Sequence, residues 1–94
     1  MFTVFGFYKF KKINFLKKNK DFLQREILKN NITGTIILSQ EGINGTIAGK
    51  RRNISQIIKC LKKVFNFKDF DSKNISQSHF QPFHKGKILS LIHI

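Results

Sequence analysis

The chain has 94 residues, and its 40% hydrophobic content suits one small globular domain rather than a disordered segment. Eighteen Lys and Arg against five Asp and Glu give a formal charge of +13, which favours a polyanionic partner, nucleic acid ahead of an anionic membrane surface. The single cysteine excludes an internal disulfide and a cysteine-cluster metal site.

The first predicted element is a strand from Phe2 to Phe10, because the segment is rich in aromatic and β-branched residues. Side chains alternate between the two faces of a strand. One face then carries Phe2, Val4, Tyr8 and Phe10, and the other carries Thr3, Phe5, Phe7 and Lys9. Since both sets contain aromatic side chains, we expect both faces of this strand to be covered.

Two amphipathic helices are predicted, each with an asparagine as its N-terminal cap. The first runs from Asn14 to about Asn30, where Asn30 and Asn31 end it. Its apolar stripe is Phe15, Leu16, Phe22, Leu23, Ile27 and Leu28. The second runs from Asn53 to Phe65, with the stripe Ile54, Ile57, Ile58, Leu61, Val64 and Phe65.

Between the helices, strands are predicted over 32–39 and 44–48, joined by a turn at 40–43. A short strand near 73–76 follows the second helix, and a last apolar stretch begins at Ile88. The order predicts an α+β, ferredoxin-like βαββαβ fold, an antiparallel sheet with two helices on one face. The other face is then left for a partner, either RNA or a second domain.

The most specific motif is Glu41, Gly42, Ile43, Asn44 and Gly45, which begins in the predicted turn and ends in the strand that follows it. One interpretation is a tight hairpin whose polar residues bond their own backbone. The other is a loop that contacts RNA or a neighbouring domain, since its glycines let the backbone approach another group closely.

The segments Gly34 to Leu38 and Glu41 to Gly49 closely resemble the N-terminal domain of the bacterial tRNA wobble-uridine hydroxylases, a family with a rhodanese-like domain. Phe7 to Phe10 resembles that family's first strand, and Pro82-Phe83 with Lys87-Ile88 resembles the entry to its next strand. The resemblance covers essentially residues 2–88.

This resemblance implies a parent protein that hydroxylates carbon 5 of the wobble uridine, with molecular oxygen as co-substrate. It places the catalytic cysteine in a rhodanese-like domain that the chain lacks. Residues 1–88 are then expected to bind tRNA or to support that domain, with no catalytic residue and no cofactor of their own. The alternative is a free-standing RNA-binding module without enzymatic activity.

The candidate phosphate contacts are clusters of basic residues, and three of them, Lys59, Lys62 and Lys63, have no acidic residue four positions away on the predicted helix. The candidates are Lys11, Lys12, Lys17, Lys18, Lys50, Arg51, Arg52, Lys59, Lys62 and Lys63. An acylphosphate hydrolase shares the βαββαβ order but needs a phosphate-binding loop with an arginine after the first strand. Lys11 and Lys12 are a poor substitute for that loop.

The remaining reactive side chains favour no chemistry. Cys60 lies at the edge of the second apolar stripe, where we expect a buried, inert thiol. His79, His84 and His93 have no acidic or cysteine companions, so no metal site is predicted. No apolar run reaches the ~20 residues of a membrane span, and no secretion signal is visible at the N-terminus. A cytoplasmic protein without a membrane partner is expected.

Residues 89–94 depart from the family pattern, which has a strand rich in Lys and Glu at this point. The six residues match a translation of a transposase end sequence used in sequencing libraries. We therefore predict that this tail is not native, the alternative being a genuine final strand.

Overall fold

The structure is a computed structural model that describes residues 1–83 and 86–90. Its elements are β1 (Phe2–Phe10), α1 (Leu16–Lys29), β2 (Thr33–Ser39), β3 (Gly42–Gly49), α2 (Arg51–Val64), β4 (Ser72–Ser78) and β5 (Gly86–Ser90). The strands form one sheet in the order β4-β1-β3-β2-β5. The first four pair antiparallel, and β5 joins the edge parallel to β2.

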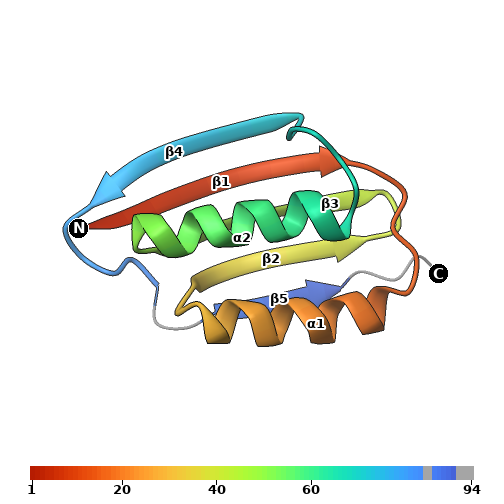
Figure 1. Ribbon diagram of the computed structural model, residues 1–94, viewed down its shortest axis with the longest axis horizontal. Helices are drawn as coiled ribbons and strands as arrows, with labels where there is room; N and C mark the ends of the chain where they lie inside the picture. Colours follow the sequence, from red (N-terminus) through yellow and green to blue (C-terminus); the bar gives the residue numbers. More distant parts are fainter. Residues whose placement is uncertain (84–85, 91–94) are drawn as a thin grey trace.

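Both helices lie on the same face of this sheet, side by side in front of the strands (Figure 1). The predicted ferredoxin-like arrangement is therefore confirmed, with β5 as an additional parallel edge strand. The sequence did not reveal the pairing of β5, because a short apolar segment carries no information about its neighbour.

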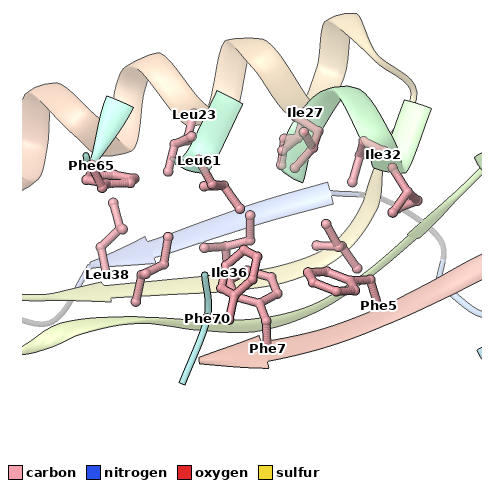
Figure 2. Packing of buried hydrophobic residues seen from close by; sticks show 14 of the residues in the cluster. Phe5, Phe7, Leu23, Ile27, Ile32, Ile36, Leu38, Leu61, Phe65 and Phe70 are labelled. Atoms are coloured by element: carbon pink, nitrogen blue, oxygen red, sulfur yellow. The ribbon is translucent and has the colours of Figure 1, made fainter. Parts of the chain in front are cut away.

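The core lies between the helices and one face of the sheet. Leu23 and Ile27 of α1 point toward the sheet, and Leu61 of α2 lies beside them (Figure 2). On the sheet side the core includes Phe5 and Ile36, which are 1% and 0% exposed. Burying a large apolar side chain contributes about 1.5–3 kcal/mol, so this layer supplies most of the stability of a small domain.

An aromatic cluster closes one edge of the core beside β1. Phe70 contacts both Phe5 and Phe7, with ring centroids 5.3 and 5.0 Å away. Phe67 packs against Phe70 at 5.0 Å. The loop after α2 is therefore anchored by its aromatic residues, a function that the sequence pattern did not indicate.

The alternation predicted for β1 is confirmed, and within the described residues only one of its two faces is covered. That another molecule covers the second face stays a prediction. Thr3, Phe5 and Phe7 are buried under the helices, whereas Tyr8 and Phe10 are 39% and 68% exposed on the other side. We call this second side the open face. It is open because both helices pack on the same side of the sheet.

Neither predicted asparagine cap is correct. Phe15, with φ 55°, occupies the position before α1, and Asn14 contributes a backbone carbonyl that accepts a 2.8 Å hydrogen bond from the Asn19 amide. Helix α2 begins at Arg51 because the Lys50 carbonyl already accepts the N–H of Ile54 at 3.0 Å. Asn53 therefore lies inside the first turn.

The ends of the predicted apolar stripes are also wrong. Phe15, Leu28 and Val64 are 79%, 60% and 38% exposed, so they lie beyond the contact between helix and sheet. The predicted end of α1 is confirmed, because Asn31 adopts the left-handed conformation with φ 53°.

The motif predicted as a loop lies mostly in a strand. Only Gln40 and Glu41 form the turn, and Gly42 already pairs with Ser39 of β2 and Phe10 of β1. A Cβ atom on Gly42 would overlap the carbonyl of Lys9, so glycine is required for this close approach. The strand therefore starts two residues before the predicted position at Asn44.

The tail prediction is only partly within the described residues. Residues 89 and 90 extend β5 beside β2, and residues 91–94 lie outside the part of the chain that the structure describes. Alternating apolar residues can pair at a sheet edge whatever their origin, so a non-native tail stays a prediction.

Candidate nucleic-acid interface

The predicted phosphate contacts lie in two groups at opposite ends of the sheet. One end carries the β2–β3 turn, the start of α1 and the end of α2 (Figure 1), and we call it the turn end. Its basic residues are Lys11, Lys12, Lys17, Lys18, Lys62 and Lys63. Lys50, Arg51 and Arg52 lie at the far end, where α2 begins, and Lys59 lies between the groups.

Nearly all of these side chains are available to a ligand. Lys11 and Lys62 are half-buried and the other eight are exposed. In the described part of the chain, only Lys62 among the ten has an acidic side chain within ion-pair distance. The structure thus presents unpaired cations at both ends.

The expectation that Lys62 lacks an acidic partner is wrong. Its Nζ atom lies 3.9 Å from an oxygen of Asp69 and 5.9 Å from the ring centroid of Phe70. Asp69 comes from the loop after α2, so a search at helical spacing could not find it. Lys62 is consequently a weaker candidate for a phosphate contact than its neighbours.

The open face is hollowed above β1, β3 and β2, with a volume of about 900 Å³. Alternation along β3 directs Gly42, Asn44 and Thr46 toward this hollow, while Ile43 and Ile47 enter the core. The polar residues of the motif therefore lie on the open face of the sheet.

The two interpretations of the motif apply to different residues. At the turn, the Ser39 hydroxyl accepts the Glu41 N–H at 3.3 Å, as expected for a self-bonded hairpin. The side-chain amide of Asn44 is exposed and has no hydrogen-bond partner within residues 1–83 and 86–90. Asn44 is thus free to bind another molecule.

Sequence reasoning did not identify the other residues of the hollow. They include Tyr8, Phe10, Thr35, Ile37, Thr46 and Phe83. The alternation of β1 already grouped Tyr8 with Phe10, but it could not tell which face the helices would leave open.

In the loop between β1 and α1, two backbone N–H groups are already bonded within the protein. The Lys11 N–H donates to the Glu41 carbonyl at 3.0 Å, and the Ile13 N–H donates to the Gln40 carbonyl at 3.1 Å. Both groups are therefore occupied within the protein, and no arginine is present in residues 11–15. This geometry agrees with the rejection of an acylphosphate hydrolase on sequence grounds.

Cys60 is half-buried rather than buried, in a groove between α1 and α2. Burial raises the pKa of its thiol, nearby Glu26 raises it further, and Lys63 lowers it by a smaller amount. The protonated thiol is a poor nucleophile, so an inert cysteine remains the interpretation. The contribution of Glu26 comes from the other helix and is not visible in the sequence.

No metal site is found among the described residues, which contain no group of three potential ligands. His79 is exposed, whereas His84 and His93 lie outside the described residues. In residues 1–83 and 86–90, no helix has the length and apolar character needed to cross a bilayer.

The strand order and the shared helix face define a domain of the acylphosphatase-like, ferredoxin type. The acylphosphatase from Bacillus subtilis has a TM-score of 0.65 and 13% identity, over 95% of this chain and 99% of that chain. Klebsiella pneumoniae BlrP1 has a TM-score of 0.70 and 14% identity, over 96% of this chain and 26% of that chain. At such low identity these likenesses establish the fold alone.

The chain belongs to the family of the UPF0176 acylphosphatase like domain, which matches residues 2–91. It is 59% identical over 88 residues to a tRNA uridine(34) hydroxylase of Pelagibacter ubique strain HTCC1062, covering 94% of this chain. It is also 36% identical over 87 residues to the protein of the same name from a Wolbachia of Brugia malayi, covering 93%. The chain spans 29% and 32% of the lengths of these two relatives.

Proposed function

We propose that this chain is the N-terminal domain of a tRNA uridine(34) hydroxylase and that it contributes tRNA binding through phosphate contacts. The observation that carries the proposal is the set of unpaired cations at both ends of a +13 domain. The relative with 59% identity supports tRNA as the polyanion. Such a substrate implies the cytoplasm.

Catalysis is assigned to another part of the longer protein. The proposed partner is a rhodanese-like domain, where hydroxylation of the wobble uridine with molecular oxygen would take place. In the present chain the thiol of Cys60 has a raised pKa and lies in a groove between helices. The residues described here therefore supply affinity or support for the neighbouring domain, not the reacting groups.

A salt titration of tRNA binding tests the binding role. Contacts to phosphate release counterions, so the logarithm of affinity falls with the logarithm of salt by about 0.7–0.9 per contact. Lys17→Gln removes an unpaired cation, and Lys73→Gln removes one that pairs with Asp69 at 3.0 Å. Both variants lose one charge, but we expect Lys17→Gln to reduce the affinity and the slope more.

Two outcomes would contradict the proposal. Absent or salt-insensitive tRNA binding would remove the RNA role and leave a domain that supports its neighbour. Mass spectrometry of tRNA incubated with the chain and oxygen should detect no 5-hydroxyuridine. A hydroxylated uridine formed by this chain alone would overturn the separation of binding from catalysis.

A further inference from the structure

Two aromatic side chains lie exposed and in contact with each other on the open face. The rings of Tyr8 and Phe10 meet edge to face, with centroids 5.1 Å apart and planes at 77°. They are 39% and 68% exposed, although the same strand buries Phe5 and Phe7 on its other side. Exposed aromatic surface on a sheet provides stacking positions for unpaired bases.

The hollow beside these rings offers hydrogen-bonding groups without charge at its centre. Across the sheet, Asn44 is paired with Tyr8 on one side and with Ile37 on the other. The Asn44 amide carries two donors and an acceptor, and in the described part of the chain none of them is bonded. Gly6 adds no side chain to the floor, so a flat ring can approach the backbone there.

Charge is located at the rim of the hollow. Lys9 contributes backbone to the lining, while its Nζ atom pairs with Asp71 at 3.5 Å and lies 5.6 Å from the ring centroid of Phe67. Glu41 lines the hollow at the turn, and the Lys11 N–H is bonded to its carbonyl. Lys11 and Lys12 follow Phe10 directly in the sequence. Because an extended chain rises ~3.3 Å per residue, both lie within about two such steps of Phe10.

This distribution matches a nucleotide more closely than a protein surface. A partly aromatic slot with the Asn44 amide at its centre fits a base, and cations one or two residues beyond Phe10 fit the phosphate of the same RNA strand. A paired stem would not fit, because its bases are stacked inside the helix and its deep groove excludes side chains. Asn44 and Thr46 are exposed and Thr35 is half-buried, so this face also offers polar groups that a base can bond.

We propose that the hollow on the open face binds an unpaired nucleobase of single-stranded RNA, which stacks on Tyr8 or Phe10 and bonds to Asn44. The phosphate next to that base contacts Lys11 or Lys12. This inference rests on the proposed tRNA-binding function and adds to it a subsite that reads unpaired rather than paired RNA.

Tyrosine fluorescence gives a direct readout, since the chain contains one tyrosine, Tyr8, and no tryptophan. Stacking of a base on Tyr8 should quench its emission when a short oligouridylate is added. The nucleotide also lowers the emission by absorbing light, and this loss is measured with free tyrosine amide under the same conditions and subtracted. Inorganic polyphosphate provides the control, because it binds cations without carrying bases and should leave the emission unchanged.

Variants separate stacking from charge. Phe10→Ala and Asn44→Ala should each weaken oligouridylate binding, by about tenfold for the aromatic residue, while the salt slope stays the same. Phe80→Ala is the matched control, because Phe80 is 81% exposed and does not line the hollow. A circular-dichroism melt confirms that each variant is folded.

The outcomes distinguish this inference from the proposed function. Salt-dependent tRNA binding without quenching, and with Phe10→Ala equal to Phe80→Ala, would overturn the base site and leave the phosphate role intact. Loss of all tRNA binding in the unmodified chain would remove both. Equal quenching by polyphosphate would also overturn the site, since no base is then needed.

Discussion

The two faces of the sheet differ although the same strands form both. On β1, Phe5 and Phe7 are 1% and 6% exposed, while Tyr8 and Phe10 are 39% and 68% exposed. Alternation separates these pairs, but only the position of the helices decides which pair becomes core. Aromatic residues in one strand therefore divide into a structural pair and a pair available for binding.

Neighbouring isoleucines on β2 offer the strongest test of this difference. Ile36 faces the helices and is 0% exposed, whereas Ile37 is half-buried and lines the hollow of the open face. We expect Ile36→Ala to lower the free energy of unfolding by about 2–5 kcal/mol, since it leaves a cavity in packed surroundings.

The matched variant Ile37→Ala should lower the free energy of unfolding by clearly less, because solvent already surrounds part of the Ile37 side chain. Urea unfolding with linear extrapolation measures both values. Equal losses would mean that something covers the open face even in the isolated chain, and would weaken the argument for a binding surface.

Glycines give a second comparison of the two faces. Gly34 lies on the covered side with φ 106°, and a Cβ atom there would overlap the carbonyl of Thr46. Gly34→Ala should therefore destabilise the domain by about 1–3 kcal/mol through backbone strain, and by more if the strands must separate.

Gly6 faces the hollow, where an added Cβ atom would meet its nearest neighbour at 3.8 Å. Gly6→Ala should leave the melting temperature unchanged or raise it slightly, because alanine loses less backbone entropy on folding. A large destabilisation by Gly6→Ala would show that the floor of the hollow has no free space for a ligand.

Much of the fold was predictable because hydrophobic periodicity and element order are local signals. Ile54, Ile57 and Leu61 were placed correctly on the buried side of α2. The asparagine caps were not, because backbone hydrogen bonds such as Ile54 N–H to the Lys50 carbonyl determined where α2 begins. An asparagine favours the N-terminal cap position, but backbone hydrogen bonds that form before it in the chain can start the helix earlier.

The candidate site was less predictable, because it depends on contacts between distant segments. The pairing of Gly42 with Phe10 placed the motif in a strand and directed Asn44 to the open face. Asp69 reached Lys62 from a loop, although the sequence at helical spacing showed no partner. Composition predicted a polyanionic partner, but it could not show that the cations lie at two ends of the molecule.

The smallest expected effect concerns an ion pair at the edge of the covered face. The hydrogen bond from Lys73 to Asp69, at 3.0 Å, lowers the pKa of the Asp69 carboxyl, and the backbone N–H of Phe70 lowers it further. Because the folded-state pKa lies below the unfolded one, the contribution to stability is present at neutral pH. It is lost as the pH falls through the folded-state pKa.

This contribution should be slight, because Asp69 is exposed to solvent and its ion pairs are screened. An NMR titration of the Asp69 carboxyl should show a pKa below that of an ordinary aspartate, moving up toward it in Lys73→Gln. The free energy of unfolding, measured across the same pH range, should hardly differ between the unmodified chain and Lys73→Gln. If Lys73→Gln leaves the pKa of Asp69 unchanged, the backbone N–H of Phe70 is the main cause of the lowered pKa. A large change in stability would mean that Asp69 anchors the loop after α2 more firmly than its exposure indicates.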